Sequence, residues 1–253
     1  MLQAFVIVLR EGFEAFLIVS VIMSYLQRIG RRRLLPAVHW GIGVSVLVSV
    51  ALGLLLSQRG YDPLWEGVLG LIAVVFVSTL VIQMWRHARQ LKRETEQQLE
   101  AIASRPSTAW AVAGVFLFTV LMVAREGIEM ALMLLQVRDP AFLVGAAGGM
   151  GCTVLLSVLW VRCSHLINLK LFFQVTSVFL LLFMGQVFLY TLHEFSEAGI
   201  FPASEAFHLA TEPFSPDGLY GKWFSILTVL VCVGWLLVAW ARQQVRKAAG
   251  QRP

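Results

Sequence analysis

The chain has 253 residues, of which 58% are hydrophobic and 14% charged, and its mean hydropathy is +0.76. This composition is too apolar for a water-soluble domain with a polar surface, so it excludes that class. A net charge of +5 would suggest nucleic acid in a soluble protein, but here the charges lie between long apolar runs. We therefore predict a multi-pass membrane protein in contact with the lipid bilayer and with no nucleic-acid partner.

Seven apolar runs are long enough to cross a bilayer, whose hydrocarbon core requires roughly 20 residues of helix. A transmembrane barrel would need alternating segments of about 10 residues, and these runs are continuous and longer. The sequence thus predicts an all-α fold with seven transmembrane helices in a single domain, 1–253. The predicted spans are 2–26, 37–57, 64–84, 109–136, 142–162, 170–192 and 223–241.

The first span, 2–26, contains three ionisable residues in the stretch VLREGFEAFLIV, residues 8–19. It has no basic segment before it, so it does not resemble a cleavable signal peptide, and we expect it in the mature protein. The fourth span repeats the pattern as VAREGIEMALML, residues 123–134. Both runs contain the motif Arg-Glu-Gly-x-Glu, which is unusual within a membrane-spanning helix.

The basic residues of the loops indicate the orientation. Fifteen lysine and arginine residues lie in the loops and tail on one side of the predicted spans, against three on the other. By the positive-inside rule the richer side faces the cytoplasm, which places the N-terminus outside and the C-terminus inside. The short chain, its brief basic tail and the lack of an N-x-S/T sequon favour the inner membrane of a bacterium, with the N-terminus periplasmic.

The repeated motif also predicts the architecture. The first span runs inward and the fourth outward, so two copies of one motif on antiparallel helices indicate an inverted repeat of three helices, with a seventh helix added. The polar segment between the halves is predicted to be a short solvated helix that ends before Pro106. The predicted parts are repeat one (about 1–84), an inner linker (85–108), repeat two (about 109–192), an outer acidic loop (193–222) and helix seven (223–241).

Residues three and four apart share one face of a helix, so each motif presents a carboxylate pair beside an arginine. The residues are Arg10, Glu11 and Glu14 in one motif and Arg125, Glu126 and Glu129 in the other. Charged side chains in the bilayer cost at least about 2.5 to 3.5 kcal/mol each, so they should face the protein interior. Two arginines offset two of the four carboxylates, and the formal surplus of two negative charges suits a cation.

Carboxylate oxygens are hard ligands, and no histidine or cysteine lies close to either motif, so iron(III) or another hard polyvalent cation is favoured. Gly12 and Gly127, between the paired glutamates, would let a neighbouring helix approach the carboxylates, although helix packing alone would also explain them. The alternative for both motifs is a self-neutralising buried ion pair that sets helix register. Repetition with surplus negative charge favours handling of an ion.

The pair REGFE and REGIE resembles the Arg-Glu-x-x-Glu motifs of the oxidase-dependent iron permeases, the iron/lead transporter family of fungi and bacteria. Seven spans and an outer N-terminus agree with that family over the whole chain. The resemblance implies that Glu11, Glu14, Glu126 and Glu129 handle iron during permeation, with Arg10 and Arg125 in the same motifs. It also implies that a partner on the outer side oxidises ferrous iron and supplies ferric iron.

The outer segment from His193 to Gly218 contains five acidic residues and no lysine or arginine, so it would concentrate cations at the entrance. Glu194, Glu197 and Glu205 are candidate capture residues, and ASE at 203–205 resembles part of an acidic loop motif of the fungal relatives. A plain solvated acidic loop explains the composition equally well. The stretch HEFSE, 193–197, fails as a zinc-protease motif because position 197 is glutamate instead of histidine.

We therefore expect a permease rather than an enzyme, with iron(III) as its substrate, no permanently bound cofactor and a periplasmic iron-oxidising or iron-delivering partner. The chain has no P-loop motif, so we do not expect it to hydrolyse ATP. The alternatives are a permease for another cation, such as lead or manganese, and a membrane scaffold or sensor in which the motifs are structural. The sequence is also compatible with a homo-oligomer.

Overall fold

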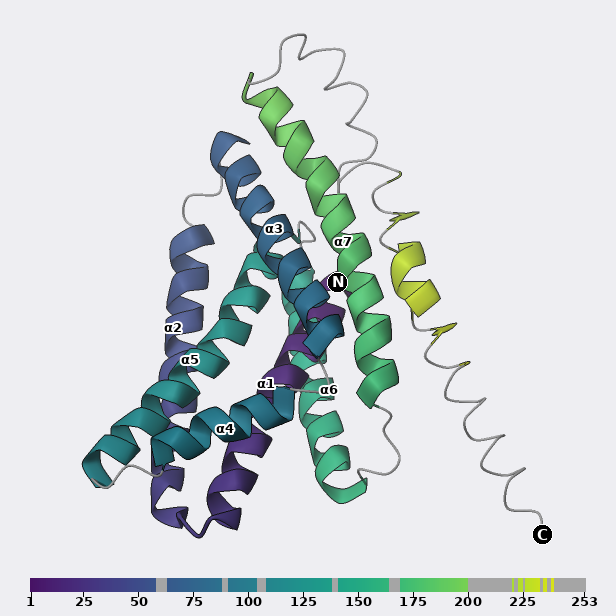
Figure 1. Ribbon diagram of the computed structural model, residues 1–253. Helices are drawn as coiled ribbons and strands as arrows, with labels where there is room; N and C mark the ends of the chain where they lie inside the picture. Colours follow the sequence, from purple (N-terminus) through teal and green to yellow (C-terminus); the bar gives the residue numbers. More distant parts are fainter. Residues whose placement is uncertain are drawn as a thin grey trace, which may run out of the picture.

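The computed structural model describes residues 1–57, 63–87, 91–103, 108–137, 141–163 and 169–199, together with residues 220, 223–224, 226–232, 234–235 and 238. Every regular element in these ranges is helical (Figure 1). The helices are α1 (Leu2–Arg28), α2 (Leu35–Ser57), α3 (Pro63–His87), α4 (Leu91–Ala103), α5 (Thr108–Leu135), α6 (Phe142–Cys163) and α7 (Leu169–Glu197), and a 3₁₀ turn, Arg32–Leu34, precedes α2. The prediction of an all-helical chain is confirmed for the described residues.

Five helices, α2, α3, α5, α6 and α7, are long and apolar enough to cross a membrane. The sixth long helix, α1, has 27 residues and so extends about 40 Å, but it carries three charged residues near its middle. The predicted seventh span, 223–241, lies only partly within the described residues, which are helical at 223–224, 226–232, 234–235 and 238. The described part of the chain thus supports a multi-pass membrane protein.

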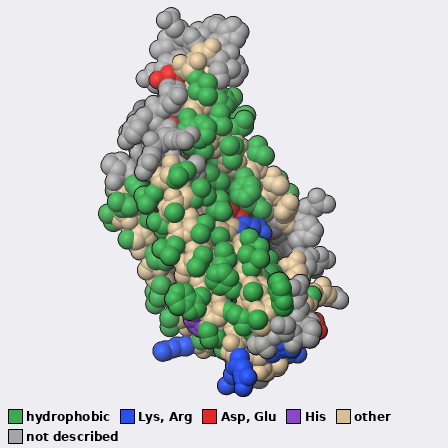
Figure 2. All heavy atoms as spheres, turned by 90° about the vertical axis from the view of Figure 1, so that its left-hand side faces the viewer, with side chains coloured by type: hydrophobic (Ala, Val, Ile, Leu, Met, Phe, Trp, Pro, Cys, Tyr) green, Lys and Arg blue, Asp and Glu red, His purple; other side chains and the backbone are tan. Residues whose placement is uncertain are grey.

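The surface of these helices is strongly apolar. Figure 2 shows hydrophobic side chains over most of one face, with lysine and arginine side chains gathered at its lower end. Large exposed side chains include Leu47 of α2, Ile72 of α3 and Leu155 of α6. A continuous apolar surface of this extent is unusual for a water-soluble monomer and is suited to contact with lipid.

The two motif helices, α1 and α5, pack against each other, and each has a second helix along its length. Helix α6 packs along α1, α2 packs along α5, and α3 packs along α7. Small residues four positions apart allow the close contacts of α6 with α1 and of α2 with α5, as is common where membrane helices meet. They are Gly145, Gly149 and Thr153 on α6, and Gly41, Ser45, Ser49 and Gly53 on α2.

Two separate cores cover the two ends of the motif helices. The first joins Ala4 and Ile7 of α1 and Met133 of α5 to side chains of α3 and α7. The second joins Ile22 and Leu26 of α1 to side chains of α2, α4 and α5. The motif residues lie between the two cores along both helices.

One predicted boundary and one predicted environment differ from the structure. Helix α7 continues to Glu197, so residues 193–197 are helical and are not part of a loop. Apolarity falls after 192, but the last turns are held against α3, where Phe195 packs on Gly67. The linker helix α4 forms as predicted but is not solvated all round, because Thr95 and Leu99 are buried.

Candidate functional site

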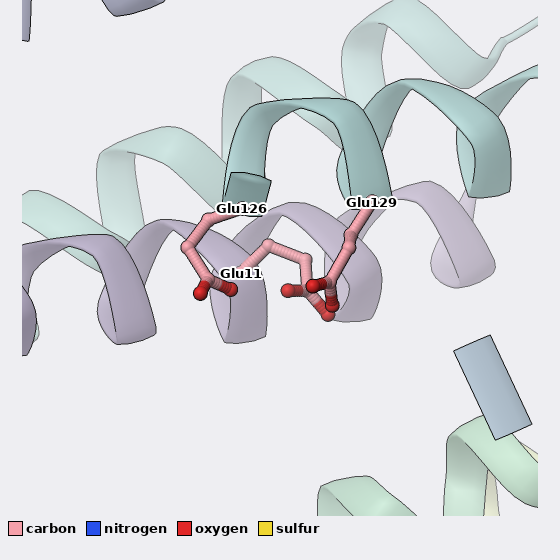
Figure 3. A group of neighbouring side chains, drawn as sticks. All are labelled: Glu11, Glu126 and Glu129. Carbon is pink, nitrogen blue, oxygen red and sulfur yellow. The ribbon is translucent and has the colours of Figure 1, made fainter. Parts of the chain in front are cut away.

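The glutamates of the two motifs converge between α1 and α5. Glu11, Glu126 and Glu129 each offer a carboxylate oxygen, and these three oxygens lie within 4.8 Å of one another (Figure 3). All three side chains are buried. Because carboxylates repel one another at such distances, this group favours a bound cation or a shared proton. Residues more than 100 positions apart in the sequence thus form one group, which we call the glutamate cluster.

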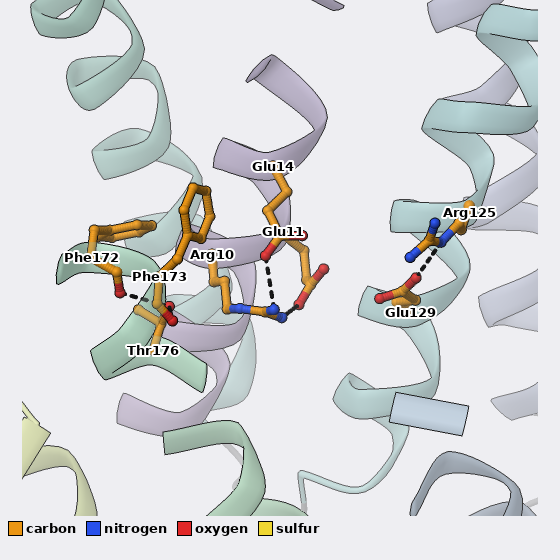
Figure 4. A network of polar contacts seen from close by, with 8 residues as sticks. All are labelled: Arg10, Glu11, Glu14, Arg125, Glu129, Phe172, Phe173 and Thr176. Atoms are coloured by element: carbon orange, nitrogen blue, oxygen red, sulfur yellow. Dashed lines mark hydrogen bonds and ion pairs between the residues drawn. The ribbon is translucent and has the colours of Figure 1, made fainter. Parts of the chain in front are cut away.

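Arg10 lies beside this cluster and is itself buried. Its guanidinium forms an ion pair with Glu11 and a second one, 2.9 Å long, with Glu14 (Figure 4). It also interacts electrostatically with Glu126 and Glu129. The predicted pairing of Arg10 with Glu14 is therefore present, and Glu14 is occupied by this arginine instead of joining the cluster.

Arg125 is placed differently. Its Nε donates a 2.9 Å hydrogen bond to Glu129, as the spacing predicts. Yet 47% of its side chain is exposed, against 3% for Arg10. Arg125 thus reaches the outside of the bundle, whereas Arg10 does not.

Two oxygens of the cluster have no hydrogen-bond donor. Within the described residues, Glu11 Oε2 and Glu126 Oε2 are buried without a partner. A buried polar atom without a partner costs about 1 to 3 kcal/mol, more if it is charged. A cation held by these oxygens would remove that cost, so the donor set fits a hard metal ion as substrate.

Both motif glycines are points of close helix approach. A Cβ added at Gly12 would lie 3.0 Å from Oγ1 and from Cγ2 of Thr153, on α6. One added at Gly127 would overlap the Oγ of Ser49, on α2. The predicted close approach at both glycines is confirmed, and the partner helix comes from the other predicted repeat in each case.

A hydroxyl-bearing side chain faces the glycine in each of these two contacts. Thr153 Oγ1 is 3.3 Å from the carbonyl oxygens of Val8 and Leu9, on α1, and 3.0 Å from that of Gly149, on its own helix. Ser49 donates to Ser45 O at 2.8 Å, within α2. We did not single out Thr153 or Ser49 from the sequence, although their four-residue spacing from other small residues on the same helix would have indicated them.

Aromatic rings cover the side of α1 that faces α7. Phe13 contacts Phe172 edge-on, with ring centroids 5.4 Å apart, and lies 6.4 Å from Phe173. Figure 4 shows the Phe172 and Phe173 rings on the Arg10 side of the ion-pair network. Apolar surface beside a charged group strengthens its electrostatic interactions by excluding water.

Neither of the predicted capture residues that the structure describes joins the cluster. Glu194 is buried in the last turns of α7 and Glu197 is exposed at its end, whereas Glu205 lies outside the described residues. Two further hydrogen bonds join helices elsewhere in the bundle. Tyr190 Oη donates a 2.9 Å hydrogen bond to Glu66, and Gln3 bonds to Gln186 at 3.2 Å.

The bundle and its buried carboxylates define a multi-pass membrane protein with a cation-suited site between α1 and α5. Comparison with known proteins is more specific. The chain matches the iron permease FTR1 family over residues 1–206 and belongs to that family. Its resemblance to the iron permeases is thus confirmed, and the chain is a transport protein rather than an enzyme.

Curated relatives agree with this assignment. The ferrous iron permease EfeU of Escherichia coli O6:K15:H31 is 33% identical over 211 residues, which are 79% of this chain and 75% of the relative. The ferrous iron permease EfeU of Yersinia pestis is 30% identical over 211 residues, 79% of this chain and 74% of the relative. No solved structure matches the chain.

Proposed function

We propose that this protein carries iron(III) across the inner membrane of a bacterium through the glutamate cluster. The observation that carries the proposal is the buried group of Glu11, Glu126 and Glu129, whose oxygens lie within 4.8 Å of one another. Two of its oxygens lack a donor within the described residues, so the site is suited to a cation. Glu14 completes the ligand set when the ion draws it from Arg10.

The proposed oxidation state and the proposed partner are supported by the chemistry of the ligands and by the names of the relatives. Carboxylates are hard donors and favour iron(III) over softer ions. The named relatives are ferrous iron permeases. We therefore propose that ferrous iron arrives outside and an iron-oxidising periplasmic partner removes one electron and passes it to its own acceptor. The resulting iron(III) then enters the cluster.

The route depends on an inverted repeat, with α1 to α3 as one half and α5 to α7 as the other. In such a repeat α1 corresponds to α5, and α2 corresponds to α6. The pair of α1 with α6 therefore corresponds to the pair of α5 with α2, and both pairs pack closely in this fold. In the same way, the contact of Gly12 with Thr153 corresponds to the contact of Gly127 with Ser49. These correspondences support the repeat, and the positive-inside rule supports an outer N-terminus.

The test is uptake of radiolabelled iron by cells that lack their own iron importers. Wild type, Glu14→Gln, Glu126→Gln and Glu129→Gln would be compared at matched membrane levels, with ferrous or ferric iron supplied. Glu66→Gln is the matched control, because Glu66 lies outside both motifs and glutamine can still accept the hydrogen bond that Tyr190 donates there. We expect uptake by wild type and the control, loss in the three motif variants, and dependence on the oxidising partner when ferrous iron is supplied.

The alternative substrates are resolved in the same cells. Excess lead or manganese that displaces iron from wild type would identify a broader cation permease. Full uptake by all three motif variants would instead mean that the motifs are structural ion pairs, as in a scaffold, and the site assignment would be wrong.

A further inference from the structure

The amphipathic helix α4 occupies a position that the permeation proposal leaves unexplained. It lies across the second core, in contact with both α1 and α5 (Figure 1). Its Leu99 is fully buried there, among Ile22 and Leu26 of α1 and Val115 of α5. These side chains lie on the Arg28 side of the glutamate cluster, opposite the core formed with α3 and α7.

Helix α4 packs on α5 at a position that has no side chain, and we call this contact the seat of α4. Gly114 of α5 faces Ile102 of α4, and a Cβ added at this glycine would lie 3.8 Å from the Cβ of Ile102 and closer still to its Cγ2. Thr95, one turn before Leu99, is also buried. The contact is therefore specific in shape, with Ile102 filling a gap that any residue larger than glycine would close.

The outer side of α4 carries polar side chains between residues 96 and 100. Gln97, Gln98 and Glu100 are exposed, and Glu96 is half-buried. Glu96 and Glu100 lie within electrostatic reach of Tyr25, near the end of α1. A helix with one apolar edge and several charges belongs at a water boundary, so α4 can leave its seat into water without exposing a wide apolar face.

From this placement we propose that α4 is the inner gate of the permease. Seated on α1 and α5, it closes the way from the glutamate cluster to the cytoplasm, and it must leave this seat for each ion to pass. The inference rests on the proposed function and its orientation, in which the Arg28 end of α1 is cytoplasmic. It assigns a movement to α4, a segment whose composition alone indicates a linker.

A reversible cross-link tests the gate directly. In a variant whose native cysteines are replaced, Ile102→Cys with Gly114→Cys would join α4 to α5, because the 3.8 Å between their Cβ positions falls within the range of about 3.5 to 4.5 Å found in disulfides. The control is Gly53→Cys with Ala131→Cys, which joins α2 to α5 across a Cβ separation of 3.6 Å. Both pairs would be purified into proteoliposomes and assayed for iron uptake, oxidised and reduced.

We expect oxidation of the gate pair to lower uptake by about ten-fold or more, with recovery on reduction, because a locked lid stops each cycle. The control pair should transport equally in both states. Equal uptake by the fully cross-linked gate pair would overturn the proposal, as would equal inhibition of both pairs. If the reduced pairs and wild type all fail to take up iron, it is the proposed function that fails.

A second measurement does not depend on uptake. Val115→Cys, placed under α4 in the cysteine-free background, would be exposed to a membrane-impermeant thiol reagent from the cytoplasmic side of inverted vesicles. Since Val115 is fully buried, we expect slow labelling without iron and faster labelling when iron is added. Labelling that stays slow under both conditions would show that α4 is a fixed brace.

Discussion

The motif on α1 and the motif on α5 have the same pattern but different surroundings. In the first, Arg10 is buried and bonds both glutamates of its own motif. In the second, Arg125 has about half of its side chain exposed and, among the described residues, forms an ion pair with Glu129 alone. Glu126 therefore lacks the arginine contact that its counterpart Glu11 has, and its Oε2 has no donor within the described residues.

This difference shows that two copies of one motif need not have the same environment. In the first motif, one buried arginine holds both carboxylates in place. In the second motif, Arg125 holds Glu129, and Glu126 Oε2 is left without a donor within the described residues. Each motif also packs against a different helix through its glycine, at Thr153 of α6 or at Ser49 of α2.

The largest expected effect comes from removing the carboxylate of Glu126, which belongs to the glutamate cluster. Glu126→Gln should reduce iron uptake more than Glu14→Gln, because Glu126 belongs to the cluster and Glu14 is already paired with Arg10. Uptake at matched membrane levels measures both. A larger loss in Glu14→Gln would mean that the arginine-paired carboxylate is the main ligand and would reverse the assignment.

The two arginines should differ in their effect on stability. Arg10→Gln leaves Glu11 and Glu14 buried without their partner, and breaking a buried pair in this way costs about 3 to 5 kcal/mol. Arg125→Gln should cost less, because Arg125 is half exposed and bonds a single carboxylate. Thermal unfolding of the purified variants in detergent compares them, and equal losses would contradict the unequal environments.

The motif glycines offer a third comparison. Gly127→Ala should destabilise the protein more than Gly12→Ala, by about 1 to 3 kcal/mol, since the new methyl group overlaps Ser49 whereas Thr153 can yield slightly. Ser49→Gly removes the obstructing side chain. We expect the double variant Gly127→Ala, Ser49→Gly to recover most of the lost thermal stability, and a failure of this rescue would show that the crowding lies elsewhere.

The smallest expected effect concerns the hydroxyl groups. Thr153→Val keeps the shape of the side chain but removes a hydroxyl placed to bond carbonyls of α1, at a cost of about 0.5 to 1.5 kcal/mol. Ser49→Ala removes a bond within α2 only, so its cost should be smaller. Thr153→Ser retains the hydroxyl and serves as the control in the same unfolding experiment.

Much of the fold could be predicted from the sequence because hydropathy is a local property that sums along a helix. The runs that become α2, α3, α5 and α6 are evident, with ends within a few residues of those observed. The continuation of α7 to Glu197 could not be predicted in this way, since contacts with α3 hold its polar last turns. The seat of α4 was missed for the same reason, because Gly114 and Ile102 are complementary only once the helices meet.

The sequence by itself determined which residues could form the site. The spacing of each motif sets its arginine and second glutamate on one helix face, and the cost of charge in lipid directs them inward. Only the tertiary structure decided which carboxylates lie close enough together to hold one ion and which arginine stays buried. Those outcomes depend on side chains from other helices. The local pattern of either motif cannot predict the positions of those side chains.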